Sequence, residues 1–418
     1  MRSISKRQFL QSATAVLSLA TFESLFARTA AIAPAALAKD DDFWESIRKR
    51  YSVTPEFIQL ENGYYSLMAD PVLESYIGHV RQVNATPSFY MRTKQMEDKL
   101  AVRKQLARLL GCPEAELIIT RNTTESLDTV IAGLDWKPGD EAVMAEQDYH
   151  SMLDMFKLQA RRHGMLNRVV SVPLHPQSDD EIVDLYESVL TPKTRLLMVC
   201  HMINLSGQIL PVRKIADMAH RRGVPVMVDG AHAFGQLDFK IDDLGCDYYA
   251  SSLHKWLGAP LGAGVLYVHH DRIKPLWQLY GDATFPDDDI RKLNHTGTHP
   301  PATDLAIVDA IGFHEAIGIQ RKNARLHYLQ RYWTDKLRGA KRIVLNTPGQ
   351  PERSCAIANV GVQGVRPADL AKTLLDKYRI FTVAIDGAGV HGVRVTPQVF
   401  TTLRELDVLV KALREIAA

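Results

Sequence analysis

The chain has 418 residues, of which 46% are hydrophobic and 23% charged, a composition typical of a globular protein with a large core. This length predicts two or three domains. The formal net charge of +2 gives no reason to expect nucleic acid or an anionic membrane as a partner. The four cysteines are widely spaced and contain no C-x-x-C pair, so we expect neither a bound metal nor a disulfide framework.

Residues 1–38 have the pattern of an export signal. They begin basic, continue through small apolar residues and reach Ala36-Leu37-Ala38, an A-x-A cleavage site. Glu23 and Arg28 interrupt the apolar part, so a stable membrane anchor is not expected. The stretch SKRQFL resembles the twin-arginine motif, with Lys6 at the first arginine position. These features predict recognition by an export machinery and a periplasmic location. The alternatives are an ordinary secretory signal, or a basic N-terminus that stays on a cytoplasmic enzyme.

Residues 86–299 alternate apolar, β-rich runs with helical patterns. We expect strands within 139–150, 194–202, 224–231, 247–255 and 262–268, and helices at 151–164 and 212–223. Strands that are apolar throughout and joined by helices predict an α/β fold whose mostly parallel sheet is buried on both faces. Ligands of such sheets bind at the carboxyl ends of the strands. This region is the predicted large, ligand-binding domain.

The pattern changes near residue 300. One long amphipathic helical region covers 302–339. Short strands are then expected at 342–345, 356–362, 380–385 and 393–395, with helices at 367–378 and 401–416. Residues 300–418 are therefore predicted to form a compact α+β second domain, with residues 39–85 packing against it.

An acid and an amine stand at the ends of two predicted strands. Lys255 follows a strand and is flanked by Leu253 and Trp256, so partial desolvation would lower its pKa and make its amine a nucleophile for a Schiff base. Asp229 ends a buried strand, and its carboxylate needs a cation such as a protonated pyridine nitrogen. The structural alternatives are a surface lysine and a helix cap or ion pair.

Two further groups suit an anionic ligand. Asn122-Thr123-Thr124-Glu125 precedes an apolar helix, where free N–H groups and two hydroxyls could hold a phosphate, with Ser252 and His254 as added donors. Arg394 lies in a short apolar strand, where a guanidinium suits a planar carboxylate or a structural ion pair. A Schiff-base lysine, a pyridinium partner, a phosphate site and a carboxylate site together predict pyridoxal 5'-phosphate (PLP) acting on an amino acid.

The stretches VDGAH, SLHK and GVRVTP, at their spacing, resemble fold-type-I PLP enzymes of the class-V aminotransferase family. This family includes cysteine desulfurases and isopenicillin N epimerase-like proteins, and the resemblance covers nearly all of residues 41–418. It implies a homodimer with an active site at the subunit interface. It also implies that Lys255 holds the cofactor and moves the Cα proton, while Asp229 keeps the pyridine nitrogen protonated.

The same resemblance implies roles for further residues. His232 would contact the phenolic oxygen, Asn204 would lie near the ring and substrate, and His150 or Tyr149 would stack on the cofactor. Arg394 would bind the substrate carboxylate, beside a pocket lined by Asn62 and Gly63. The implied phosphate contacts are Thr123, Thr124, Ser252, His254 and, from the other subunit, Thr298.

The loop before Arg394 reads AIDGAGVHG and contains no cysteine, so a persulfide route of desulfuration is not expected. The remaining epimerase-like branch includes racemases, lyases and transaminases. With the export signal, the chain also resembles periplasmic PLP enzymes of pyoverdine siderophore maturation, which modify a glutamate group on a peptide. We therefore expect an enzyme acting at Cα of an amino acid or peptide. The alternatives are a PLP-dependent C–S lyase and a non-catalytic periplasmic binding protein of the same fold.

Overall fold

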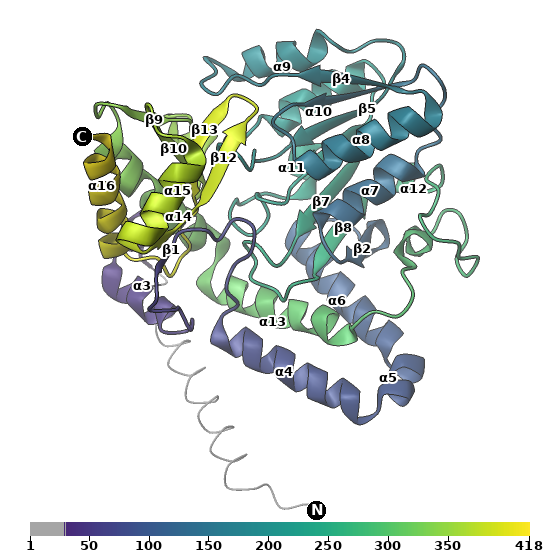
Figure 1. Cartoon of the computed structure of the whole chain (residues 1–418). Coiled ribbons are helices and arrows are strands. Elements are labelled where there is room, and N and C mark those ends of the chain that lie inside the picture. The colour runs from purple at the N-terminus through teal and green to yellow at the C-terminus, as the bar shows by residue number, and fades with distance from the viewer. Residues whose placement is uncertain (1–28, 30) are drawn as a thin grey trace, which may run out of the picture.

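The computed structural model describes residue 29 and residues 31–418, so most of the predicted export signal lies outside the described residues. The chain forms two lobes, which lie side by side in Figure 1. The larger lobe contains a seven-stranded sheet. Its strand order is β2 (Leu117–Thr120), β8 (Gly264–Val268), β7 (Tyr248–Ser252), β6 (Val226–Asp229), β5 (Thr194–Cys200), β3 (Glu141–Ala145) and β4 (Leu166–Val170).

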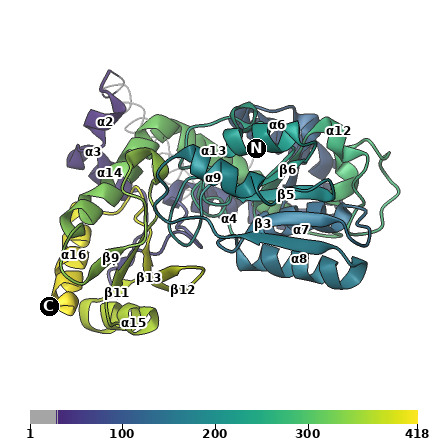
Figure 2. The ribbon, with the colours of Figure 1, turned by 90° about the horizontal axis from the view of Figure 1, so that it is seen from above.

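Helices cover both faces of this sheet, as Figure 2 shows from above. One face packs on α7 (Thr123–Gly133) and α8 (His150–His163), and the other on α6 (Gln95–Leu110), α9 (Asp179–Glu187) and α10 (Val212–Arg221). Neighbouring strand residues point to opposite faces, so Leu197 packs in one core and Leu196 in the other. The predicted α/β fold with a doubly covered sheet is confirmed.

The sheet is mixed, and the mostly parallel order that the sequence predicts is confirmed. Strands β4, β3, β5, β6 and β7 are parallel, whereas β8 runs antiparallel to β2 and β7. A parallel connection requires a long crossover, usually a helix. Only turns and loop lie between Ser252 and Gly264, so the chain reverses direction there and β8 pairs antiparallel.

The smaller lobe contains the C-terminal part of the chain. Its antiparallel sheet has the order β12 (Val383–Gly387), β13 (Val390–Val395), β10 (Ala358–Val362) and β9 (Ile343–Leu345). It packs with α14 (Ile319–Leu337), α15 (Pro367–Tyr378) and α16 (Leu403–Ala417). A separate parallel pair joins β1 (Ile58–Gln59) to β11 (Ile380–Phe381).

The division between the lobes differs from the predicted boundary at residue 300. The expected single helical region is two helices, α13 (Pro301–Ile317) and α14, separated by Gly318 with φ of 87°. Helix α13 contacts α4 (Asp70–Ala85) and α6, and its apolar face belongs to the core of the large lobe. The small lobe therefore begins after Gly318.

The N-terminal segment is also shared between the lobes. Helix α3 (Asp41–Arg48) is tied to α16 by the ion pair of Arg48 with Glu405, and β1 pairs with the small lobe. Helix α4 instead packs on α13 of the large lobe. The remaining elements are α2 (Pro34–Leu37), α5 (Pro87–Thr93), α11 (Ile241–Leu244), α12 (His270–Ile273) and the 3₁₀ turns η1 (Glu114–Glu116), η2 (Ile290–Asn294) and η3 (Pro351–Arg353).

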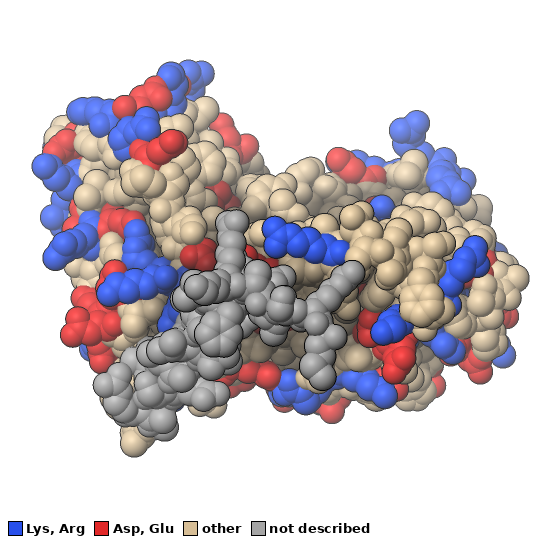
Figure 3. Space-filling model, turned by 90° about the horizontal axis from the view of Figure 1, so that it is seen from below, with Lys and Arg blue, Asp and Glu red and all other residues tan. Residues whose placement is uncertain are grey.

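The surface has a mixed charge. Figure 3 shows one face, on which Lys and Arg side chains are interspersed with Asp and Glu over both lobes. Within the part of the chain that the structure describes, no helix is long and apolar enough to span a bilayer.

Candidate active site

A cavity of about 170 Å³ opens at the carboxyl ends of β5, β6 and β7. Parallel strands end together at one edge of a sheet, so residues far apart in sequence meet there. Tyr64 and Tyr65, from the segment after β1, contribute to the opposite wall. Of the residues predicted from sequence, those that line the cavity are Thr123, Thr124, Tyr149, Asn204, Asp229, His232, Ser252, His254 and Lys255.

Lys255 follows β7 and forms a hydrogen-bonded series with two aromatic residues. Its Nζ lies 3.1 Å from Nε2 of His232, and Nε1 of Trp256 donates to Nδ1 of the same ring at 3.3 Å. Burial lowers the pKa of Lys255 to about 8, with Asp229 opposing this shift. Burial also lowers the pKa of His232, as does the neighbouring charge of Lys255.

This series determines which ring nitrogen of His232 carries the proton. An indole N–H can only donate, so Nδ1 of His232 must carry a lone pair. A neutral imidazole then carries its proton on Nε2 and donates it to Lys255. The Lys255 amine can accept that bond only when it is unprotonated. The geometry therefore favours the form of Lys255 that can act as a nucleophile or a base.

Asp229 is the last residue of β6, the strand next to β7 in the sheet. Its Oδ1 accepts from the N–H of Ala231 at 3.0 Å, and the residue is 5% exposed. Burial raises the pKa of Asp229, while the bond from Ala231 and the charge of Lys255 oppose that rise. A protonated pyridine nitrogen beside this carboxylate would supply the missing positive charge.

The N-terminus of α7 forms the other end of the cavity. Asn122 caps the helix by accepting from Glu125 N–H at 2.9 Å, so the first turn is held rigidly. Ser252 Oγ accepts from Thr123 N–H at 2.9 Å and lies 2.7 Å from Thr123 Oγ1. Two hydroxyl groups and a helix N-terminus thus meet at one point, an arrangement suited to a phosphate.

The cavity residues fit the cofactor that the resemblance implies. They supply an amine, a carboxylate and a helix N-terminus around one cavity, which match the aldehyde, the ring nitrogen and the phosphate of PLP. Two polar atoms in the cavity wall, His254 Nδ1 and Asn204 Oδ1, are buried without a hydrogen-bond partner among the described residues. Such atoms are costly unless a ligand satisfies them.

Three of the predicted substrate-side residues lie behind the cavity wall. Arg394 is fully buried and forms an ion pair with Glu61. The backbone N–H of Asn62 donates to Thr396 Oγ1 at 2.7 Å, and its Nδ2 donates to the Thr396 carbonyl at 2.8 Å. Gly63 packs against the Arg394 guanidinium. These residues brace the wall, and the two tyrosines after them face the cavity.

Two other predicted residues lie outside the cavity. His150 is the first residue of α8 and is exposed, whereas the preceding Tyr149 lines the cavity. Of the two candidates for stacking on the cofactor, the structure therefore places Tyr149 at the site. Thr298 is exposed in the segment before α13. Its predicted contact is with the partner subunit's cofactor, which a single chain does not contain.

Sequence reasoning missed several residues of the site. From the sequence, Trp256 is only an apolar neighbour of Lys255, yet its indole N–H orients His232. Tyr65 stacks on His254 with ring centroids 5.9 Å apart. Cys200 lines the cavity at the end of β5, and burial holds its pKa well above the ordinary thiol range. In the sequence, Trp256 follows a predicted strand and Cys200 lies near the end of another, whereas no predicted strand precedes Tyr65.

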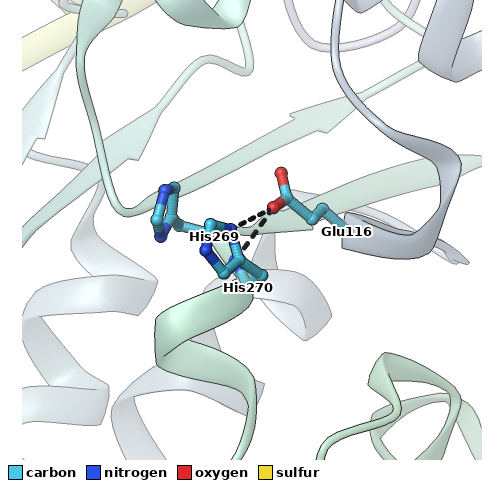
Figure 4. A group of neighbouring side chains, drawn as sticks. All are labelled: Glu116, His269 and His270. Carbon is cyan, nitrogen blue, oxygen red and sulfur yellow. Dashed lines mark hydrogen bonds and ion pairs between the residues drawn. The ribbon is translucent and has the colours of Figure 1, made fainter.

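A second polar cluster lies outside this cavity (Figure 4). Glu116, His269 and His270 place three ligand atoms within 4.8 Å of one another. The Glu116 carboxylate is already used, because Oε1 accepts from the backbone N–H of His270 at 3.1 Å and lies 2.8 Å from its Nδ1. This arrangement is explained by attachment of α12 to η1, and it gives no independent sign of a metal.

Comparisons with known proteins show the family of the chain. The class-V aminotransferase family model matches residues 66–410. Isopenicillin N epimerase of Amycolatopsis lactamdurans is 29% identical over 394 residues, covering 90% of this chain and 98% of the epimerase.

Two solved structures share the fold. The apo structure of the cysteine desulfurase from Thermococcus onnurineus NA1 has a TM-score of 0.77 at 23% identity, covering 89% of this chain and 98% of that chain. A C-DES variant with glycine covalently linked to its PLP cofactor has a TM-score of 0.80 at 22% identity, covering 88% and 99%. The chain belongs to the class-V aminotransferase family of PLP-dependent enzymes and has its fold-type-I architecture.

Proposed function

We propose that this protein binds PLP at Lys255 and uses it to remove and return a proton at the amine-bearing carbon of an amino acid or a peptide-linked amino acid. The observation that carries this proposal is the convergence of Lys255, Asp229 and the N-terminus of α7 on one cavity. When bound, PLP supplies an electron-accepting ring that stabilises negative charge on that carbon.

The residues of the chain would divide the work as follows. The Lys255 amine would bind the cofactor covalently and, when displaced by the substrate amine, would take up the carbon-bound proton. Asp229 would keep a proton on the pyridine nitrogen. Tyr149 would stack on the ring, while Thr123, Thr124, Ser252 and His254 would hold the phosphate. Asn204 would contact the ring or substrate with its unpartnered Oδ1.

Proton transfer without sulfur transfer is supported by where the cysteines lie. The segment 383–394 contains no cysteine, and Cys355 is buried in the core beside α14. Cys200 reaches the cavity, but burial and the nearby carboxylates of Asp148 and Asp229 raise its pKa and disfavour the thiolate. Isopenicillin N epimerase as a relative supports the same choice.

The active unit would be a homodimer in the periplasm. A partner subunit would bring its Thr298 segment to the phosphate end of the cavity, as the family resemblance implies. The export signal and the periplasmic location remain proposals based on residues 1–38, and a siderophore peptide as substrate rests on the same signal. Sequencing the N-terminus of the exported protein and measuring its mass in solution would test the location and the dimer.

The deciding experiment follows the proton. The PLP-loaded protein is incubated in heavy water with L- and D-amino acids and with short peptides, and proton NMR records loss of the Cα signal. Exchange with inversion indicates an epimerase, and a keto acid with pyridoxamine phosphate indicates a transaminase. Pyruvate with a released group indicates a lyase. A protein that retains no PLP contradicts the proposal and favours a binding protein on this fold.

A variant of Lys255 tests whether this residue binds the cofactor and carries the proton. We expect Lys255→Ala to abolish both covalent retention of PLP and exchange of the Cα proton. Lys157→Ala is the matched control, because Lys157 lies on the exposed face of α8 and forms an ion pair with Asp154. Full exchange by the Lys255 variant would exclude this lysine as the proton carrier.

A further inference from the structure

Arg394, the residue expected to bind a substrate carboxylate, already holds a carboxylate from its own chain. Its Nε donates to Glu61 Oε2 at 3.2 Å, and its Nη2 donates to Glu61 Oε1 at 2.8 Å. Arg394 is fully buried and Glu61 is 5% exposed. This two-point contact is the geometry with which an arginine binds a carboxylate most strongly.

The other sides of the guanidinium are also occupied. Nη1 donates to the carbonyl of Asn204 at 3.1 Å, and the ring of Tyr64 lies 4.0 Å from Cζ. On a further side, a Cβ added to Gly63 would stand 3.1 Å from Nη2. The edge that a second carboxylate would approach is therefore faced by the main chain of Asn204, and Tyr64 stands between Arg394 and the cavity.

Glu61 cannot easily turn away from this pair. Its Oε1 also accepts from the backbone N–H of Tyr64 at 2.7 Å. Its backbone forms a bridge with Thr396, on the chain that follows β13. Glu61 and Arg394 therefore join the N-terminal segment to the small lobe as one fixed unit.

This pairing changes what the cavity can bind. The ion pair has no net charge, so an α-carboxylate placed beside it would be a buried anion without a cation of its own. A carboxamide or a peptide bond carries no charge and needs only hydrogen bonds. The buried Oδ1 of Asn204, which has no partner among the described residues, can accept from such an amide N–H.

We propose that Glu61 is a specificity-determining residue that neutralises Arg394 and selects substrates whose carboxyl group next to the amine-bearing carbon is amidated or peptide-linked. The proposal rests on the proposed function, since it concerns the substrate of the same cavity. It predicts that removing the charge of Glu61 frees Arg394 to attract a carboxylate.

The test compares two ligands that differ only in this group. Binding of L-alanine and of L-alaninamide to the PLP-loaded protein is measured by calorimetry and by the change in cofactor absorbance. We expect Glu61→Gln to strengthen the binding of L-alanine relative to L-alaninamide. The dissociation constant of L-alanine divided by that of L-alaninamide should fall by tenfold or more. Comparing the ratio between variants cancels the different basicity of the two amines. An unchanged ratio overturns the proposal.

Glu405→Gln is the matched control, because Glu405 forms a similar two-point pair with Arg48 away from the cavity. We expect this variant to leave the ratio unchanged, and an equal shift there would also overturn the proposal. If Glu61→Gln does not fold, propionate and propionamide are compared as ligands of the wild-type protein. Tighter binding of propionamide supports the proposal, and tighter binding of propionate contradicts it. Failure to load PLP would instead refute the proposed function.

Discussion

The Nζ atom of Lys255 lies 3.1 Å from Nε2 of His232. Which of these two atoms donates the hydrogen bond is determined by the contact of Trp256 with the other ring nitrogen, Nδ1. Because the Trp256 N–H occupies Nδ1, the ring donates to Lys255 and does not accept from it. The contacts thus favour the unprotonated form of the amine, which the role implied by the family resemblance requires. This relationship has consequences that can be measured on the protein before any cofactor is added.

The first prediction concerns the pH dependence of Lys255. Burial lowers its pKa to about 8, so the free amine is lost as the pH falls through that value and is fully present above it. Brief labelling of the cofactor-free protein with acetic anhydride, read by mass spectrometry, should give Lys255 a midpoint near that pH. Exposed lysines in general titrate near ~10.4. A midpoint of Lys255 in that higher range would contradict the structure.

The second prediction tests the role of Trp256. In Trp256→Phe, Nδ1 of His232 loses its donor, so the ring can carry its proton there and accept from a protonated Lys255 through Nε2. A hydrogen bond to a charged group contributes roughly 1.5–3 kcal/mol, so the labelling midpoint of Lys255 should rise by about one pH unit. Trp136→Phe is the control, since its N–H donates to the Ile131 carbonyl in the core. Equal midpoints in both variants would exclude the tautomer argument.

The third prediction concerns the proposed phosphate site. The hydroxyl of Thr123 lies 2.7 Å from Ser252 Oγ in the cavity, whereas that of Thr129 on the same helix donates to the Glu125 carbonyl. A hydrogen bond to an anion is worth about 1.5–3 kcal/mol, so Thr123→Val should weaken PLP binding by about tenfold or more. Thr129→Val should not change it. Equilibrium dialysis with PLP measures both, and equal affinities would place the phosphate elsewhere.

Local patterns explain what could be predicted from the sequence. Helix α15 has the predicted bounds 367–378 because Pro367 begins it and Arg379, in the left-handed region with φ of 55°, ends it. Asp229 and Lys255 were found because each ends or follows an apolar strand, and the carboxyl ends of parallel strands meet. These signals need only a short window of sequence.

What the sequence could not reveal depends on contacts between distant segments. Glu61 and Arg394 are separated by 333 positions, so their spacing in the sequence does not indicate that they pair. A glutamate that follows an apolar run indicates only that a buried cationic side chain is needed nearby. Tyr149 and His150 are adjacent, and which of them faces the cavity depends on where α8 begins. The helix begins at His150, and the sequence pattern does not locate that start to a single residue. The direction of β8 and the packing of α13 with the large lobe were likewise set by partners beyond the local pattern.

The end of the predicted export signal, Leu37 and Ala38, is packed into the fold. Leu37, in α2, is 1% exposed and belongs to a core cluster with Trp44. The Trp44 N–H donates to the Leu37 carbonyl at 2.8 Å, and Arg325 Nη1 donates to the Ala38 carbonyl at 2.8 Å. Both donors are buried. A chain cut after Ala38, at the predicted cleavage site, would lose these contacts.

The last prediction therefore compares a chain that begins at Lys39 with one that begins at Pro34. Loss of a buried leucine costs about 1.5–3 kcal/mol, and a buried donor left unpaired adds roughly 1–3 kcal/mol. The shorter chain should thus unfold at a lower urea concentration, with a free energy of unfolding about 2–4 kcal/mol smaller at the same pH and PLP concentration. The chain from Pro34 is the control, because it keeps α2. Equal stabilities would show that α2 contributes nothing to the stability of the folded enzyme. Cleavage after Ala38 would then leave the free energy of unfolding unchanged.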